Sequence, residues 1–393
     1  MDVSWKVYLA LSLVMFFEYA VWGAWAPVLA ARLLGPLKMT GKQTGWIYTT
    51  LPIACIVSPL VAGQLADRYW NLEWIVAAAH VVAALFMFAA VRQKHFGGLF
   101  VMMLGWSLCY AATMPLVNAA LFAHAPAISG KVFIWAPIGW ALVGYSLSGW
   151  RMLRSGESDG SDAMILAGVL GLVMAACCFF LPATPPAPSA DAGGNAIQQV
   201  FEIIKQPDFL LFIITSVFVA GTMQFYFLGS GQYMMDRGIS GKAVPGAMAL
   251  AQVAQAVVTW YLLDRAIEQF GFKWTLVMGT CSWLLLYVIY AVRAPRPILF
   301  VSQVLHGFAY VMFMIVTQKY CGAIAPKAIG GSMQGLIFAA TTGVGLFLGT
   351  QLAGFAMDKH SVAGKFQWPK IWAYPLIITL AGALVFAVAF KGK

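Results

Sequence analysis

The chain has 393 residues, of which 61% are hydrophobic and only 10% are charged, and its formal net charge is +10. A soluble protein of this length needs more charged surface than this composition supplies, whereas a lipid-facing surface needs none. The composition therefore excludes an ordinary soluble protein and indicates a chain that lives in a membrane.

Long apolar runs follow one another along the whole chain, each sufficient to cross about 30 Å of hydrocarbon as a helix. Most connections between them are short, so consecutive helices should be antiparallel neighbours. The sequence predicts an all-α membrane protein with twelve transmembrane helices, over residues 7–34, 43–66, 72–91, 96–123, 132–152, 163–181, 208–235, 244–263, 274–292, 297–320, 329–357 and 368–390.

One connection differs from the others in length and composition. Residues 182–207 are rich in Pro, Ala, Ser and Gly and lack a long apolar run, which is typical of a flexible linker. This segment predicts an N-terminal six-helix bundle over residues 1–181, a cytoplasmic linker over 182–207, and a C-terminal six-helix bundle over 208–393.

The two predicted bundles share an Asp-Arg pair at corresponding depth. Asp67 and Arg68 end the second span of the first bundle, and Asp264 and Arg265 end the second span of the other. An internal repeat of this kind is typical of transporters. We expect these four residues to act in conformational gating.

Residues 63–70, GQLADRYW, resemble the G-x-L-A-D-[RK]-x-G signature of the major facilitator superfamily, with Trp70 in place of the final glycine. This resemblance implies two six-helix halves, alternating access, and both termini in the cytoplasm. It places the protein in the cytoplasmic (inner) membrane. The distribution of Lys and Arg does not favour this orientation, because more of them fall on the outer connections than on the inner ones.

Other function classes find no support in the sequence. The six cysteines lie within or at the ends of apolar runs without metal-type spacing, and we interpret them as packing residues. We identify no nucleophile–base pair and no cofactor loop, so we expect neither an enzyme nor a cofactor. The cations are scattered through short loops rather than gathered in a basic stripe, which excludes a nucleic-acid partner.

Glu18 is the acidic residue predicted to lie deepest in the membrane, near the centre of the first span. Charge at this depth is costly and therefore points to function. One interpretation is a proton carrier, because burial favours the protonated form of a carboxyl group. The alternative is a buried carboxyl group bonded to a neighbouring helix. His80, in the middle of the third span, fits an interhelical hydrogen bond better than a functional role.

No Lys or Arg lies near the middle of a predicted span, so an anionic solute would lack a counter-charge, and we expect a neutral one. The central polar groups are amides, hydroxyls, imidazoles and indoles, which suit the hydrogen-bonding edges and flat faces of a nucleoside or a sugar. Helix–helix contacts are the alternative explanation for several of them. The candidate substrate-binding residues are Trp22, Tyr110, Thr113, Asn118, Trp140, Gln224, Gln252, Gln255, His306 and Tyr310.

Several segments resemble the nucleoside:proton symporter family within that superfamily. Residues 18–25 (EYAVWGAW) resemble its W-G-[SA]-W opening, and residues 134–140 (IWAPIGW) resemble its I-W-G-T-I-G-[FW] fifth helix. Tyr110, Thr113 and Asn118 match a Y-x-x-T-x-x-x-x-N pattern of its fourth helix. Gln224 matches a glutamine of its seventh helix. Residues 252–255 (QVAQ) and 332–335 (SMQG) are similar to its Q-x-x-E and S-A-Q-G motifs.

The chain departs from this family's pattern at charged positions. Phe133 replaces an arginine, Gln255 and Val311 replace acids, and Pro137 replaces a threonine. Three charged groups that the family would use for nucleoside or proton binding are therefore absent. Either Glu18 takes over proton coupling, or the protein is a facilitator, or its substrate differs.

The sequence thus predicts a secondary active transporter that moves a neutral polar solute by alternating access. A nucleoside is the favoured solute, and proton symport through Glu18 is one mode of coupling. The alternatives are a facilitator or symporter of a sugar or another neutral solute, and a multidrug exporter. The expected partners are the solute, protons and membrane lipid, and we expect a monomer.

Overall fold

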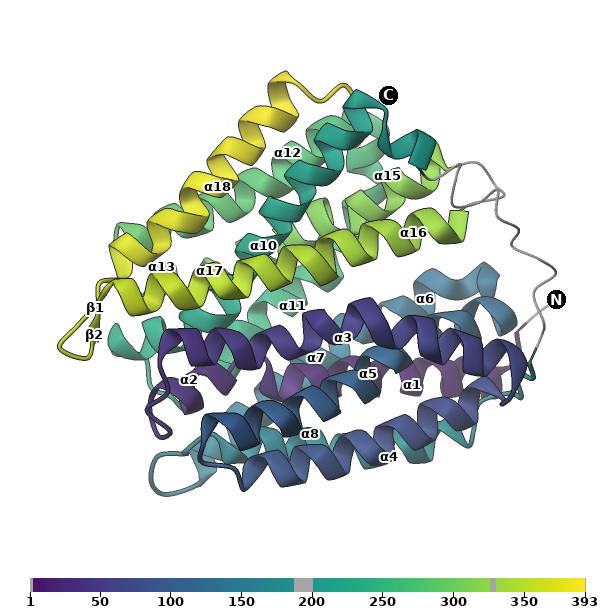
Figure 1. Cartoon of the computed structure of the whole chain (residues 1–393), viewed down its shortest axis with the longest axis horizontal. Coiled ribbons are helices and arrows are strands. Elements are labelled where there is room, and N and C mark those ends of the chain that lie inside the picture. Colours follow the sequence, from purple (N-terminus) through teal and green to yellow (C-terminus); the bar gives the residue numbers. More distant parts are fainter. Residues whose placement is uncertain (1–2, 187–200, 326–329, 393) are drawn as a thin grey trace.

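The computed structural model describes residues 3–186, 201–325 and 330–392 and is almost wholly helical (Figure 1). We refer to its first helices, which precede residue 187, as the N-terminal group. Their bounds are α1 (Trp5–Trp25), α2 (Leu29–Leu34), α3 (Gly41–Arg68), α4 (Leu72–Val91), α5 (Phe96–His124), the 3₁₀ turn η1 (Pro126–Ile128), α6 (Ser129–Phe133), α7 (Trp135–Leu153) and α8 (Ser161–Cys178).

The helices after residue 206 form the C-terminal group. They are α10 (Pro207–Asp236), α11 (Val244–Tyr261), α12 (Leu263–Ala291), α13 (Arg296–Val301), α14 (Gln303–Ala309), the π-helix η2 (Tyr310–Ile315), α15 (Val316–Ile324), α16 (Gly330–Phe338), the π-helix η4 (Ala339–Gly345), α17 (Leu346–Lys359) and α18 (Trp368–Val388). A short hairpin of β1 (Ser361–Val362) and β2 (Lys365–Phe366) joins the last two, with Ser361 opposite Phe366.

Local sequence explains where these helices begin and bend. Ser4 caps α1, and Thr40 with Gln43 forms a capping box that starts α3. Gly271 lies inside α12 with a positive φ of 70°, so a short helical segment over 263–270 precedes the apolar span. The sequence predicts a connection at this point and a span that begins at residue 274.

Eleven helical runs within the described residues are long and apolar enough to cross a membrane. They correspond to eleven of the twelve predicted spans. The boundaries differ by six residues or fewer, except that the run matching the predicted span 274–292 already begins at Leu263. The predicted span over residues 244–263 is the exception. It is observed as the 18-residue helix α11 but is not among the eleven.

Helix packing within each group is extensive. In the N-terminal group α1 packs against α7 and α8, and α5 packs against α3 and α4. In the C-terminal group α12 packs against α18, α10 against α17, and α11 against α14. Figure 1 shows the two groups one beside the other, with the N-terminus at the end opposite the β1–β2 hairpin. We call the end with the hairpin the distal end.

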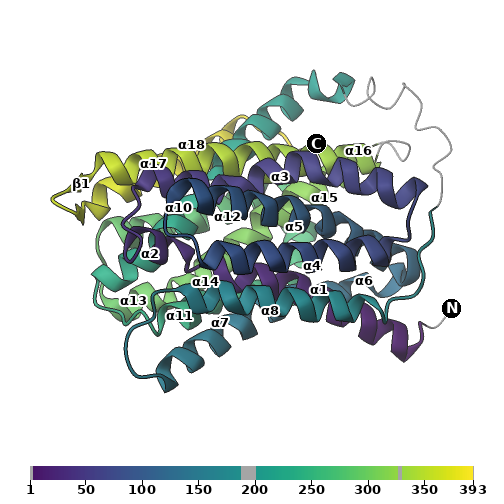
Figure 2. The ribbon, with the colours of Figure 1, turned by 60° about the horizontal axis from the view of Figure 1, so that its bottom comes forward.

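The two groups meet along two helix pairs. One pair is α3 with α17, and the other is α7 with α11. Figure 2 shows both pairs from a second direction, with α3 alongside α17 and α11 near α7. We call the surface between these pairs the seam.

An ion pair fixes the connection between α7 and α8 at the distal end. Arg32 Nη1 lies 2.5 Å from Asp159 Oδ2, and Arg32 Nη2 donates to the carbonyl of Val91. Partial burial opposes ionisation of Asp159, but hydrogen bonds from Ser161 and the Arg32 guanidinium outweigh it and lower its pKa to about 2. Asp159 therefore stays ionised at neutral pH.

Candidate functional site

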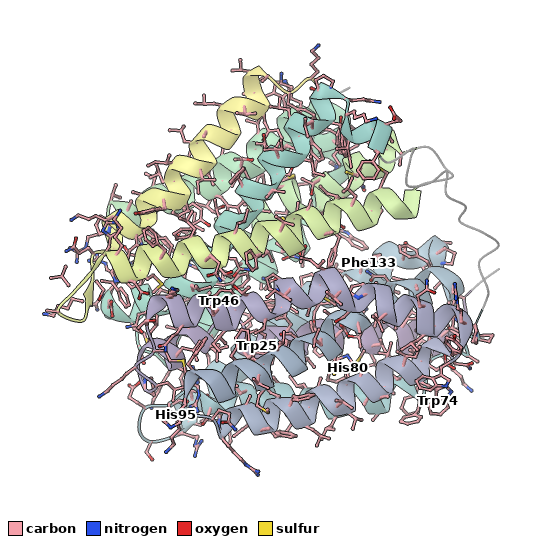
Figure 3. The ribbon with its side chains drawn as sticks, viewed as in Figure 1. Trp25, Trp46, Trp74, His80, His95 and Phe133 are labelled. Atoms are coloured by element: carbon pink, nitrogen blue, oxygen red, sulfur yellow. The ribbon has the colours of Figure 1, made fainter. Side chains whose placement is uncertain are left out.

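Glu18 lies inside the N-terminal group, where its carboxylate is wholly buried. Its Oε2 is 2.8 Å from Nε2 of His80 on α4, and its Oε1 accepts a 2.8 Å hydrogen bond from the hydroxyl of Thr113 on α5. The Tyr110 hydroxyl donates to the backbone carbonyl of Glu18. Figure 3 shows His80 among the helices of the N-terminal group, away from the C-terminal group.

This cluster joins residues for which the sequence predicts separate roles. His80 makes the interhelical hydrogen bond that we expected of it, and its partner is Glu18 itself. Thr113, a candidate for substrate contact, bonds to Glu18 and to the carbonyl of Tyr110. Three helices thus form one buried carboxyl site. Its carboxyl group is positioned by His80 and Thr113, which lie 62 and 95 residues further along the sequence.

The aromatic side chains beside Glu18 extend from this cluster to the seam. Trp22 is half-buried and packs edge-on against Trp140, with ring centroids 4.9 Å apart, and its centroid is 6.3 Å from that of Tyr110. The ring centroid of Trp140 in turn lies 6.2 Å from that of Phe227 in the C-terminal group. Gly23 leaves room for this packing, because a Cβ there would lie 2.7 Å from the Trp140 ring.

The C-terminal group contributes polar side chains of α10 and α11. Gln224 is buried, and its Oε1 has no hydrogen-bond partner among the described residues. Gln252 is buried and Gln255 half-buried on α11. A buried amide oxygen without a partner is costly, so a ligand that donates a hydrogen bond to Gln224 would be favoured.

Tyr310 begins the π-helix η2 and is half-buried. It lies near enough to Tyr19 of α1 for a charge on one of the two side chains to affect the other. Single π-helical turns occur often at functional sites because they displace side chains from the regular helix face. Tyr19 and the π-turn were not identified from the sequence, where nothing distinguishes this turn from its neighbours.

His306 and its neighbours form a network inside the C-terminal group. The Trp283 indole N–H donates to His306 Nδ1 over 3.2 Å, and the Tyr226 ring stacks on the imidazole with centroids 3.7 Å apart. Tyr226 also donates to Gln303 Oε1, while Gln303 donates to the Tyr290 hydroxyl. These partners hold His306 in place within its own group. Asn118 lies beyond Thr113 on α5 and is half-buried.

The residues expected to act in gating have different surroundings. Asp264 pairs with Lys319 of α15 over 2.6 Å, and Arg68 and Arg265 are exposed. The side chain of Asp67 lies outside the described residues.

The seam is closed at the distal end. The Asp358 carboxylate at the end of α17 accepts hydrogen bonds from the backbone N–H groups of Gly41 and Lys42, which open α3. A carboxylate at a helix N-terminus satisfies free N–H groups and interacts favourably with the helix dipole. Asp358 therefore caps a helix of the other group.

Further contacts of the seam lie along the same two helix pairs. Thr49 shares a 2.6 Å hydrogen bond with Thr350, and Gln351 donates to Thr49. The Gly246 N–H donates to Ser148 between α11 and α7. The crevice beside Trp140, between Gly23 and Ala249, is too narrow to hold a water molecule.

We expect Asp358→Asn to weaken the closed distal end. An amide keeps the shape of the carboxylate but loses its charge, and charge-assisted hydrogen bonds are about twice as strong as neutral ones. Spin labels at Lys42 and Lys359, both exposed, should then report a larger fraction of long distances. Unchanged distances would contradict a capping role, and Asp236→Asn, inside the C-terminal group, is the control.

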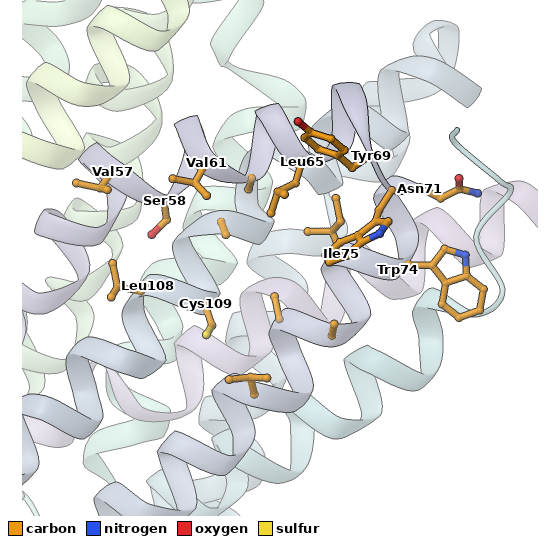
Figure 4. A pocket seen from close by; sticks show the side chains of 16 residues that line it. Val57, Ser58, Val61, Leu65, Tyr69, Asn71, Trp74, Ile75, Leu108 and Cys109 are labelled. Carbon is orange, nitrogen blue, oxygen red and sulfur yellow. The ribbon is translucent and has the colours of Figure 1, made fainter. Parts of the chain in front are cut away.

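A large cavity of about 880 Å³ lies away from these residues, on α3, α4 and α5 (Figure 4). It is a groove with apolar walls such as Val61, Leu65 and Ile75, and its end carries Tyr69, Trp70 and Trp74. None of the candidate substrate-binding residues lines it. An apolar groove offers few hydrogen-bonding partners to a polar solute, so we do not assign the solute to it.

Comparison with known proteins identifies the family of the chain. Residues 5–393 match the family model described as nucleoside H+ symporter. The putative nucleoside transporter YegT of Escherichia coli is 28% identical over 97% of this chain and 93% of its own length. The xanthosine permease of the same organism is 24% identical over 98% and 96%. A crystal structure of a mutant of the nucleoside transporter NupG superposes with a TM-score of 0.89 at 20% identity, covering 98% of this chain and all of the other.

Proposed function

Because the chain belongs to the nucleoside H+ symporter family, we propose that it carries nucleosides across the membrane together with protons. The absence of Lys and Arg from the candidate site supports a neutral solute. The relatives named above are a putative nucleoside transporter and a xanthosine permease, which supports a nucleoside rather than a sugar.

We propose that α11 is a twelfth span, so that the chain has two six-helix halves. Two observations support this. Helix α11 packs against α14 of its own group and against α7 of the other, as a helix embedded between two bundles would. Its 18 residues are about 27 Å long at 1.5 Å per residue, close to the thickness of the hydrocarbon core.

We further propose that both termini are cytoplasmic and that the distal end faces outward. Among the described residues, the hydrogen bonds between the two groups lie on the distal side of the seam, along its two helix pairs and between Lys242 and the carbonyl of Arg154 just beyond α7. In this orientation the described conformation is closed to the outside. Alternating access then requires the contacts of Asp358, Thr49 and Thr350 to break.

The proposed solute site lies at the seam between Trp22 and Trp140 on one side and Gln224, Gln252, Gln255 and Tyr310 on the other. The indoles offer flat faces for a base, and the amides offer donors and acceptors for its edges and for ribose hydroxyls. The single observation that carries this assignment is the buried, unpartnered Oε1 of Gln224. Glu18, one helical turn before Trp22 on α1, is the proposed proton carrier.

Counterflow exchange in proteoliposomes tests the substrate. Vesicles loaded with unlabelled nucleoside should take up labelled nucleoside transiently, whereas vesicles loaded with a sugar or an amino acid should not. Exchange of sugars but not of nucleosides would contradict the proposal and would show that the protein carries sugars.

Gln224→Ala tests the site itself. We expect the half-saturating nucleoside concentration to rise about tenfold, because the loss of one buried hydrogen bond of about 1.4 kcal/mol corresponds to that factor. Gln232→Ala is the matched control, since Gln232 lies on the same helix and donates to Asp236 at an exposed position. Equal effects of the two substitutions would argue against a contact between Gln224 and the solute.

A further inference from the structure

The Thr113 hydroxyl has two acceptors for a single proton. Its Oγ1 lies 2.8 Å from Glu18 Oε1 and 2.7 Å from the backbone carbonyl of Tyr110, three residues earlier on α5. A threonine hydroxyl has one proton to donate and two lone pairs that accept. Thr113 can therefore donate to only one of these oxygens with good geometry at a time.

The two arrangements suit two protonation states of Glu18. When Glu18 is ionised, Thr113 donates to Oε1. When Oε1 carries a proton, the Thr113 hydroxyl can turn its own proton to the Tyr110 carbonyl and accept from Glu18. Neither state leaves the carboxyl group or the hydroxyl without a partner, so neither has the cost of a buried unsatisfied group.

His80 serves the other carboxyl oxygen. Its Nε2 is 2.8 Å from Oε2, and both side chains are buried. Nδ1 has no hydrogen-bond partner among the described residues. The neutral imidazole with its proton on Nε2 leaves only an acceptor unpaired at Nδ1, whereas the imidazolium would leave a buried donor unpaired there. The geometry thus favours a neutral His80 that donates to Glu18.

We propose that His80 and Thr113 are positioning residues that make Glu18 a reversible proton-binding site in the N-terminal group. This inference rests on the proposed proton symport. The proton comes from water on one side of the membrane, forms an O–H bond at Oε1, and returns to water on the other side. Thr113 only reorients its hydroxyl, and His80 keeps its proton throughout.

The other titratable groups around Glu18 leave it as the one acid of this cluster. Tyr110 of α5 and Cys178 of α8 interact electrostatically with it, as does Tyr19 on α1 itself. Phenols and thiols are neutral at physiological pH unless strongly perturbed. Helix α7 presents Gly139 and Trp140 to α1, and Lys131 of α6 is exposed.

The test is the pH dependence of proton-driven nucleoside uptake in proteoliposomes. Thr113→Val removes the donor to the ionised carboxylate while keeping the shape of the side chain. The pH at which uptake is half-maximal should move up by about one unit, the effect of losing one hydrogen bond to a charged group. His80→Phe should move it in the same direction, and Thr113→Ser should restore the wild-type value.

Thr280→Val is the matched control, because Thr280 is a buried threonine whose hydroxyl donates to the carbonyl of Leu276 on its own helix and to no other group among the described residues. It should leave the midpoint unchanged. A midpoint for Thr113→Val equal to that of the wild type, with counterflow intact in both, would overturn the inference. So would a shift of the same size in Thr280→Val.

A second measurement detects protonation of Glu18 directly and does not depend on transport. Infrared difference spectra of purified protein at varied pH should contain a protonated-carboxyl band that Glu18→Gln removes and Thr113→Val shifts to higher pH. If this band titrates as expected while no nucleoside exchange is found, the proposed function fails and the proton site remains. If Glu18→Gln leaves every such band in place, the proton site fails whatever the protein transports.

Discussion

Glu18→Gln is expected to abolish uphill nucleoside accumulation and to spare counterflow exchange. Glutamine keeps the size of the side chain and can still accept from Thr113 or His80, so the packing between α1, α4 and α5 should survive. It cannot take up and release a proton near neutral pH. Coupling to the proton gradient is therefore lost, while exchange, which needs no net proton movement, continues.

The measurement is the ratio of internal to external nucleoside in proteoliposomes with an imposed inward proton gradient. The wild type should exceed equilibrium, and the variant should stop at a ratio of about one, because a carrier without its coupling proton only equilibrates its solute. Glu73→Gln is a suitable control, since Glu73 lies in the first turn of α4 and accepts from Asn71 and Thr184. Accumulation by Glu18→Gln at the wild-type level would show that Glu18 is not the proton carrier.

This experiment is decisive because the chain lacks charged residues at the positions where the family resemblance implies them. Phe133, Gln255 and Val311 stand where the family resemblance implies charged groups, and the described structure places no other buried pair of carboxyl and imidazole groups in the chain. If the protein couples to protons, few alternatives to Glu18 remain. If it does not, the wild type should itself equilibrate nucleoside without accumulating it.

The helices were predictable from the sequence because each apolar run is long and strongly hydrophobic. Glu18 was predictable for a related reason, since a carboxyl group in the middle of such a run is rare and costly. Its partners were not, because the contacts with His80 and Thr113 depend on how three helices rotate against one another. Helix periodicity gives a face for each residue, but it does not give the neighbour on that face.

The contacts that close the distal end were even less predictable from the sequence. Asp358 is an exposed acidic residue at the end of a helix, and nothing near it in the sequence suggests that it caps α3, 317 residues away. Similarly, the glycines of α3 and α17 look like ordinary small residues of transmembrane helices. Only the packing reveals that they let two backbones approach closely across the seam.

Gly354→Val is expected to block the closed distal end and thereby to abolish transport. A Cβ at residue 354 would lie 2.5 Å from the carbonyl oxygen of Gly41 and 3.3 Å from the Cα of Lys42, both backbone atoms that cannot turn aside. Closing the seam against such an obstacle costs about 1–3 kcal/mol or more. Relative to the wild type, the closed population should fall by about one to two powers of ten.

Two measurements separate this effect from misfolding. Spin labels at Lys42 and Lys359 should report a shift to longer distances, and nucleoside binding to the detergent-solubilised variant should persist while transport is lost. Gly149→Val is the matched control, because Gly149 lies on α7 with open space around its Cβ position. A Gly354→Val protein that transports at the wild-type rate would show that α3 and α17 need not approach this closely during the cycle. In that case the glycines would serve packing alone, and the distal contacts would have no part in alternating access.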